Sequence, residues 1–175
     1  SVWGEELVSQ RESLGKPRPP IQVVPTRRGV GIEREMLYNI PEVRVVLLTI
    51  GACVEPMRAA LAARPWITAV VLDPSEGLAE GFERLRALGI EQISCVGGRN
   101  LATQLIDAGL VQDVYLTTSA RPGGEPETPM YAGRLDADVV VRKRGTEDET
   151  GVVFEHLRIR SPLKPDPGPA GAGPT

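Results

Sequence analysis

The strongest chemical signal in the sequence is a pair of glycines between an expected strand and an expected helix. Gly97 and Gly98 follow the apolar run Ile90–Val96, and a helical pattern begins directly after them. The N-terminus of a helix presents unpaired N–H groups and a partial positive charge, and glycines let a phosphate approach these groups closely. Arg99 in the first turn opposes the helix dipole, which is easier to understand if an anion lies there. The alternative is that the two glycines only make a tight turn.

The other residues that could do chemistry are isolated. His156 is the only histidine, and the sequence identifies no catalytic partner for it, so we expect a structural or surface role. Cys53 and Cys95 each lie beside an apolar run and form neither a disulfide framework nor a metal motif, so we expect two buried, reduced thiols. The acidic run 147–149 lies in a charged turn without a Gly-rich loop, which favours solvation over metal binding.

The elements that must position the glycine pair form a regular alternation of strands and helices. The expected strands are apolar runs of the kind buried in a parallel sheet. These runs are Val43–Ile50, Ile67–Asp73, Ile90–Val96 and Asp113–Ser119. Helical patterns lie between them: one has Pro56 in its first turn, the next ends at Gly89, and the third runs from Gly98 to Ala108. This order predicts right-handed βαβ crossovers and a parallel sheet.

The two ends of the chain depart from this alternation. Shorter elements are expected near the start: a helix over the first dozen residues, a strand at Ile21–Val24 and a possible strand at Glu35–Leu37. Near the other end, Val139–Arg144 and Val152–Arg160 flank a charged turn and predict a β-hairpin. Residues 161–175 are rich in Pro, Gly and Ala and should be disordered. We therefore expect one α/β domain over residues 1–160, with a mixed, mostly parallel sheet and a C-terminal β-hairpin.

Composition narrows the possible partners. With 175 residues and 41% apolar content, the chain is long enough for one domain with a core, and the 4% aromatic content means that Val, Leu, Ile and Ala fill it. A net charge of −3, with the two signs interspersed, argues against nucleic acid or an acidic membrane as partner. No run approaches the roughly 20 apolar residues of a membrane span. Together with two reduced thiols, this predicts a cytoplasmic protein.

Residues 91–124, EQISCVGGRNLATQLIDAGLVQDVYLTTSARPGG, resemble the reductase domain of the bifunctional deaminase-reductase family of riboflavin biosynthesis. The family pattern is a strand, Glu-Gly-Gly, a Leu-rich helix, Ala-Gly-Leu-Val-Asp-Glu, a strand, and a loop with Pro and Gly. The matching pieces here are Gly97-Gly98, the helix from Leu101 to Ile106, Ala108–Asp113 and Arg121–Gly124. The resemblance extends over about Ile21 to Arg160, and it implies a dihydrofolate-reductase-like, three-layer α/β/α fold and a homodimer.

The resemblance also implies a site for NADPH. Its diphosphate would bind the backbone N–H groups at the start of the helix that follows the glycines. The residues concerned are Gly97, Gly98, Arg99, Asn100, Leu101, Ala102, Thr103 and Gln104. Thr49 matches a Thr beside the cofactor, and Thr26 and Arg27 match the turn near the adenosine 2′-phosphate. Arg27 or Arg28 would pair with that phosphate bidentately, the alternative being a solvated turn.

The sequence departs from the family in two places. Val96 stands where the family has a Glu that helps to bind substrate, so the identity of the substrate is open. The family's first strand, helix and second strand, which carry much of the substrate pocket, are not recognisable, so the resemblance is to an amino-terminally shortened reductase.

Two hypotheses follow from this resemblance. The first is an NADPH-dependent reductase that converts the ribose side chain of a ribosylamino-pyrimidine to ribityl, as a 5-amino-6-(5-phosphoribosylamino)uracil reductase does. In such a reaction the cofactor supplies the hydride, which explains why the sequence shows no catalytic triad. The second is a non-catalytic nucleotide-binding or dimerisation remnant of such an enzyme, and both Val96 and the missing first elements favour it.

Overall fold

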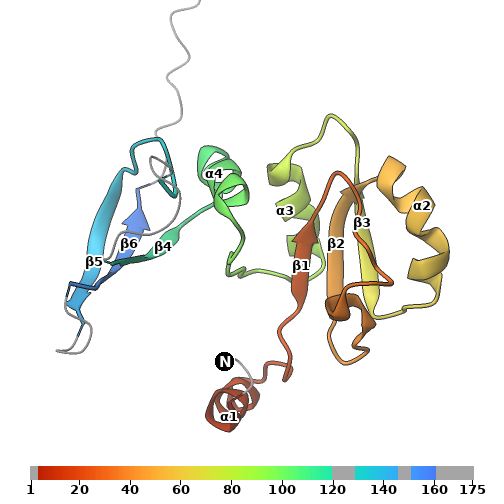
Figure 1. The fold of residues 1–175 in the computed structure, drawn as a ribbon, viewed down its shortest axis with the longest axis horizontal. Helices are drawn as coiled ribbons and strands as arrows, with labels where there is room; N and C mark the ends of the chain where they lie inside the picture. The colour runs from red at the N-terminus through yellow and green to blue at the C-terminus, as the bar shows by residue number, and fades with distance from the viewer. Residues whose placement is uncertain (1–3, 120–128, 146–150, 161–175) are drawn as a thin grey trace, which may run out of the picture. The chain divides into compact units, whose positions relative to one another are not determined.

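The computed structural model describes residues 4–119, 129–145 and 151–160 (Figure 1). The chain divides into two compact units, Ser1–Ile93 and Ser94–Thr175, called unit 1 and unit 2 below. The proposed loop at 121–124, the acidic turn at 147–149 and the expected disordered tail at 161–175 lie outside the described residues. The single domain expected over residues 1–160 stays a prediction.

Unit 1 is built around a small parallel sheet. Its elements are α1 (Glu5–Ser13), β1 (Gln22–Pro25), the 3-10 helix η1 (Met36–Asn39), β2 (Val45–Ile50), α2 (Gly51–Ala62), β3 (Ile67–Leu72) and α3 (Leu78–Ala87). The strand order is β1-β2-β3, and both pairings are parallel, with Val45 opposite Gln22 on one side and Ile67 on the other. The apolar run of β2 therefore occupies the middle of the sheet, as its composition predicts.

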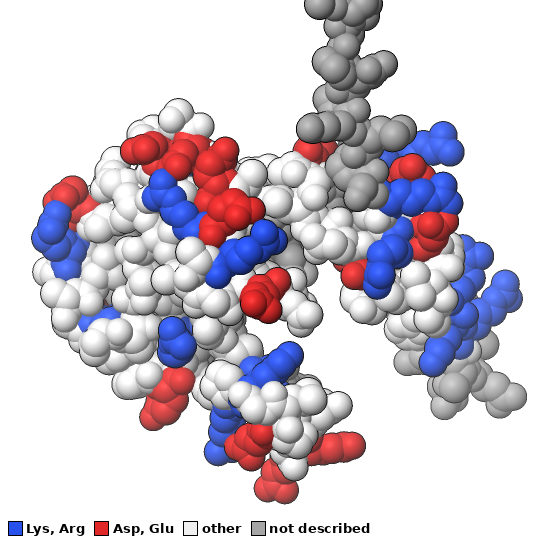
Figure 2. All heavy atoms as spheres, turned by 180° about the vertical axis from the view of Figure 1, so that it is seen from behind, with Lys and Arg blue, Asp and Glu red and all other residues white. Residues whose placement is uncertain are grey.

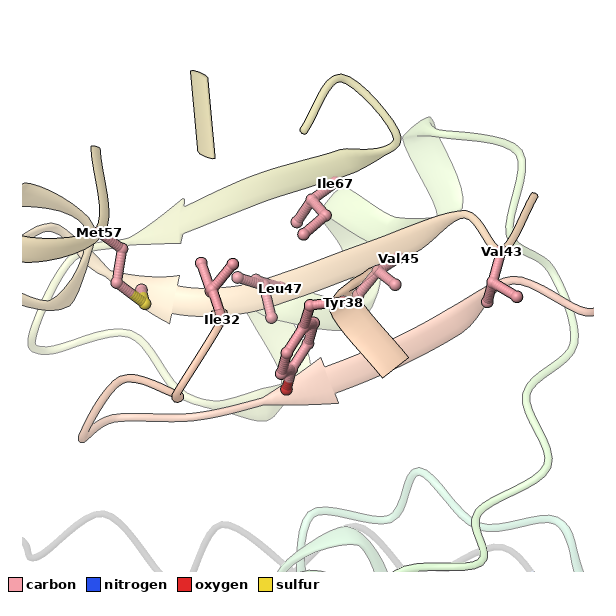
Figure 3. Packing of buried hydrophobic residues seen from close by; sticks show 7 residues of the cluster. All are labelled: Ile32, Tyr38, Val43, Val45, Leu47, Met57 and Ile67. Carbon is pink, nitrogen blue, oxygen red and sulfur yellow. The ribbon is translucent and has the colours of Figure 1, made fainter. Parts of the chain in front are cut away.

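Alternation along β2 divides the core of unit 1 into two layers. Val45 and Leu47 pack in one cluster with Met57 of α2 (Figure 3). Their neighbours Val46 and Leu48 pack on the other face, in the cluster that contains Leu85 of α3 and residues of β3. Helices thus cover both faces of the sheet, which is the three-layer α/β/α arrangement that the resemblance implies.

Glycines fix the position and the end of α3. A Cβ on Gly81 would lie 2.7 Å from Cδ2 of Leu48, so a residue without a side chain lets α3 approach the sheet this closely. Gly89 has a φ of +79°, a conformation that glycine adopts without strain, and it follows the C-cap Leu88. The predicted end of this helix at Gly89 is confirmed.

Unit 2 contains one helix and an antiparallel sheet. Its elements are α4 (Arg99–Asp107), β4 (Asp113–Thr118), β5 (Ala137–Arg144) and β6 (Val153–Ile159), and the strand order is β4-β6-β5. The predicted hairpin is confirmed as β5 and β6, with an irregularity in the pairing between Val139 and Val141. Among the described residues of unit 2, Leu105 of α4 alone is buried.

The predicted strand Ile90–Val96 is wrong. These residues belong to neither sheet, and the side chain of Val96 is 95% exposed. A strand is stable only when its backbone forms hydrogen bonds with a neighbouring strand, and no described strand pairs with this segment. Cys95 lies within it and is exposed, so the prediction of two buried thiols is also wrong, and Cys53 is half-buried.

Three further expectations need correction. Glu35–Leu37 forms no strand, and η1 begins at Met36 instead. Pro56 lies inside α2 rather than in its first turn, because the helix begins at Gly51 directly after β2. The α/β class with parallel and antiparallel strands is confirmed, but these strands form two sheets rather than one mixed sheet. Basic and acidic side chains are interspersed over the face drawn in Figure 2, as the sequence predicts.

Candidate functional site

The N-terminus of α4 in unit 2 has backbone N–H groups without an acceptor among the described residues. Gly98 is its N-cap residue, and the carbonyl of Gly98 accepts the N–H groups of Leu101 and Ala102 at 3.1 Å each. The N–H groups of Arg99 and Asn100 have no acceptor among the described residues. No side chain caps the helix, and its first turn contains no acidic residue. This end of the helix therefore presents a partial positive charge and free donors, which are the features of an anion site.

The two glycines before α4 have different surroundings. A Cβ on Gly97 would lie 2.8 Å from Cδ2 of Leu101, so close packing explains this glycine. A Cβ on Gly98 would meet no described atom within 4 Å, and Gly98 has a φ of −69°, which any residue can adopt. Neither packing nor backbone conformation requires a glycine at position 98. Glycine is also a favourable N-cap residue, and at this position it leaves room for a ligand.

A hollow of about 470 Å³ lies beside this helix end. It is lined by Arg99, Asn100, Thr103, Gln104, Pro129 and Ala132. Four of the residues expected to bind the diphosphate therefore share one concave surface, and all four carry polar or basic side chains. The amide of Gln104 donates to the carbonyl of Asn100 at 3.1 Å, which holds one wall of the hollow in place.

Unit 1 has a second hollow, of about 400 Å³, at the carboxyl end of its parallel sheet. The loop that follows β1 and the first turns of α2 line it: Arg28, Gly29, Val30, Gly31, Ala52, Cys53, Pro56 and Met57. Ligands of open α/β sheets bind outside the carboxyl ends of parallel strands. The helix end here is also without a side-chain cap or an acidic residue in its first turn. This hollow is the candidate anion site of unit 1.

Thr26 and Arg27, both expected near the 2′-phosphate, serve the structure of unit 1. The hydroxyl of Thr26 donates to the carbonyl of Gly29 at 3.0 Å and accepts the N–H of Arg28 at 3.2 Å, which closes the turn. The guanidinium of Arg27 donates to the carbonyls of Pro74 and Glu76 in the loop between β3 and α3. Its donors are therefore directed at the protein itself.

Thr49 is the one residue of the predicted site that is fully buried. Its side chain is 1% exposed, and its hydroxyl has no hydrogen-bond partner among the described residues. A buried polar group without a partner costs about 1–3 kcal/mol. Thr49 follows Val45 and Leu47 in the alternation of β2, so its side chain lies on the face that packs against α2.

The predicted site residues are distributed over the two units. Thr26, Arg27 and Thr49 belong to unit 1, and Gly97–Gln104 belong to unit 2, where their backbone surrounds one helix end. Val96, expected at the substrate, has an almost fully exposed side chain. The described residues that line each hollow belong to a single unit.

Sequence reasoning missed the partner of His156. Its Nε2 lies 2.7 Å from Oδ1 of Asp113, and the guanidinium of Arg158 donates to the same oxygen at 2.7 Å. The hydrogen bond with His156 contributes most, and that with Arg158 next, to holding the pKa of the Asp113 carboxyl below its ordinary value. The ring of Tyr115 stacks on the imidazole, with 4.5 Å between ring centroids. The pairing of β4 with β6 brings these residues together from positions 43 apart, and no local pattern signals it.

Two further features are absent from the described residues. Among the described residues, no three His, Cys, Asp or Glu side chains are grouped so that they could hold a metal ion. In the same part of the chain, every helix is too short or too polar to cross a membrane.

Comparison with known proteins gives a result at the level of structure. No protein-family model matches the sequence, and no curated protein matches it. A pyrimidine reductase-like protein from Corynebacterium diphtheriae superposes with a TM-score of 0.73 over 91% of this chain and 69% of its own, at 17% identity. The chain has the fold of this reductase-like protein.

Two forms of RibD from Acinetobacter baumannii have the same fold at lower similarity. Each gives a TM-score of 0.59 and 15% identity over 81% of this chain. The chain spans only 38% of the length of RibD. The fold expected from the sequence resemblance is confirmed by these neighbours, and at such identities they establish the fold alone.

Proposed function

We propose that this chain is an NADPH-dependent reductase of the riboflavin-biosynthesis type, which reduces the ribose side chain of a ribosylamino-pyrimidine to ribityl. The observation that carries the proposal is the start of α4, where an uncapped helix end, an open Gly98 and a polar hollow coincide in a reductase-like fold. When bound, NADPH supplies the hydride, and the protein supplies binding and orientation.

The residues present fit a phosphorylated dinucleotide. In unit 2 the free N–H groups of Arg99 and Asn100 would bind the diphosphate, and Thr103 and Gln104 would add side-chain donors. In unit 1 an uncapped helix end and Arg28 lie at a second hollow. The hollow of unit 2 is therefore the candidate site for the diphosphate.

The position expected to contact the substrate differs from that of the family. Val96 offers only apolar surface where the family has a carboxylate, so any polar contact to the pyrimidine must come from elsewhere. Neither hollow is lined by a described Asp, Glu or His. This feature favours the second candidate, a nucleotide-binding remnant without catalysis, because such a chain needs the phosphate sites and no acid or base.

Two measurements on the full chain separate the candidates. The first is the affinity for NADPH, measured by quenching of tryptophan fluorescence or by calorimetry. The second is the loss of NADPH absorbance when the ribosylamino-pyrimidine is added. Binding with turnover supports the reductase, and binding without turnover supports the remnant. A folded chain that binds no NADPH contradicts the proposed reductase.

A further inference from the structure

The hollow of unit 2 has two walls of different chemistry. The polar and basic wall comes from α4, and the apolar wall consists of Pro129 and Ala132, from the segment that precedes β5. Residues 129–135 are called the wall segment below. A small inorganic anion needs only the polar wall and the free N–H groups at the start of α4. A ligand that carries apolar surface as well as an anionic group can contact both walls.

One hydrogen bond ties the wall segment to the rest of the described protein. Its residues belong to no helix or strand, and their backbone groups have no hydrogen-bond partner among the described residues. The phenol of Tyr131 donates to Oδ1 of Asp107, the last residue of α4, at 2.8 Å. The position of the apolar wall beside α4 therefore depends on this contact and on packing.

The contact accounts for the residue types at two neighbouring positions. A carboxylate at the end of a helix opposes the helix dipole, so Asp107 is unfavourable for α4 itself, and its bond with Tyr131 offsets this. A Cβ on Gly133 would lie 2.6 Å from Cε1, Cζ and Oη of Tyr131, so the ring occupies the space that another side chain would need. The hydrogen bond with Asp107 also raises the pKa of the Tyr131 phenol, which therefore remains a donor at neutral pH.

We infer that Tyr131 is a positioning residue of this hollow. By donating to Asp107 and packing over Gly133, it holds Pro129 and Ala132 in place as the apolar wall. It thereby sets the affinity for a ligand that has both an anionic group and apolar surface. The inference rests on the proposed function for the identity of that ligand, NADPH. Inorganic diphosphate has no apolar surface, so its binding at the helix end is independent of Tyr131.

The first test compares the affinities of the full chain for NADPH and for inorganic diphosphate. Tyr131→Phe keeps the ring and removes only the hydroxyl, so it should weaken NADPH binding about tenfold and leave diphosphate binding unchanged. Tyr115→Phe is the matched control, because it makes the same change in the same unit at a hydroxyl without a described hydrogen-bond partner, and it should alter neither affinity.

Changes at the acceptor complete this test. Asp107→Asn keeps an acceptor oxygen and should bind NADPH with nearly wild-type affinity, whereas Asp107→Ala should weaken NADPH binding as much as Tyr131→Phe does. Equal losses of affinity for NADPH and diphosphate in Tyr131→Phe would mean a general disruption of the hollow and would overturn the inference. Wild-type NADPH affinity in both Tyr131→Phe and Asp107→Ala would also overturn it.

A second test needs no dinucleotide. Arg134 lies in the wall segment and is exposed, so trypsin can cleave after it when the segment leaves α4. Cleavage there should be about tenfold faster in Tyr131→Phe and Asp107→Ala than in the wild type, while cleavage after Arg86 of α3 stays unchanged. If the wild type binds no NADPH but cleavage follows this pattern, the proposed function fails and the role of Tyr131 in holding the wall stands. Equal cleavage rates in all variants overturn the inference, whatever NADPH does.

Discussion

Replacing Gly98 by valine tests the proposed diphosphate site most directly. Gly98 is exposed, has backbone angles that any residue adopts, and has open space where a Cβ would lie. A branched side chain there would enter the space in front of the free N–H groups of Arg99 and Asn100, and its Cβ would meet no described atom within 4 Å. The variant should therefore lose ligand affinity and keep its fold.

The magnitudes can be worked out for both properties. A hydrogen bond to a charged group contributes about 1.5–3 kcal/mol, so losing one or two of them should weaken NADPH binding at least tenfold. Valine is a poorer N-cap residue than glycine, which costs up to about 1 kcal/mol, but it also restricts the unfolded chain, which returns about 0.4–1 kcal/mol. These terms nearly cancel, and the melting temperature without ligand should move by only a few degrees.

The assay is a pair of measurements on each variant, a melt without ligand and an NADPH titration. Gly97→Ala is the matched control, because its Cβ would lie 2.8 Å from Cδ2 of the half-buried Leu101, and that side chain must shift to admit it. It adds a methyl group beside Gly98 and should bind NADPH with nearly wild-type affinity. A Gly98→Val variant that melts normally and binds NADPH with wild-type affinity would refute the diphosphate site, and the glycines would then be a structural turn.

Three further predictions concern stability, pH and assembly. Leu85→Ala should lower the free energy of unfolding by about 2–5 kcal/mol, measured by urea denaturation, because Leu85 is fully buried between α3 and the sheet. The contact with His156 lowers the folded-state pKa of Asp113, so its stabilisation is present above the unfolded pKa near 3.9 and is lost as the pH falls. The melting temperatures of the wild type and Asp113→Asn should therefore differ near pH 7 and converge as the pH falls through the folded-state pKa of Asp113, and a difference that does not change with pH would contradict this. We also propose that the chain self-associates, because Tyr115 and Phe154 are exposed on a sheet with almost nothing buried, and a clean monomer in sedimentation at tens of micromolar, roughly, would contradict this.

The sequence predicts the elements whose patterns are local. A strand buried on both faces is a continuous apolar run, and β2 is one. A helix buried on one face has apolar residues at helical spacing, as Leu78, Phe82 and Leu85 of α3 do. Both patterns can be recognised without knowledge of the partner element. In the same way, Gly89 marks the end of α3, and Gly97 and Gly98 mark the start of α4. For these elements composition and periodicity are sufficient.

The features that the sequence could not predict depend on distant residues. Ile90–Val96 has the composition of a strand, but a strand also needs a neighbour, and residue types within the segment carry no information about one. Arg27 and Arg28 are chemically identical, and only the carbonyls of Pro74 and Glu76 distinguish their roles. The contact of Asp113 with His156 likewise depends on the register of β4 and β6.

If the chain bound no ligand, another residue would be more stable than the one present at each of three positions: Gly98, Arg99 and Thr49. A serine or aspartate at position 98 would cap α4 better than glycine by a few tenths of a kcal/mol, and a carboxylate in place of Arg99 would agree with the helix dipole instead of opposing it. Thr49 buries a hydroxyl without a partner, where valine has nearly the same shape and no polar atom. Local departures from what the fold prefers are expected where a ligand supplies the missing interaction. These three departures, two at the start of α4 and one at Thr49 of β2, favour a chain that still binds an anionic ligand over a remnant kept only for dimerisation. Turnover with the pyrimidine then separates the reductase from the nucleotide-binding remnant.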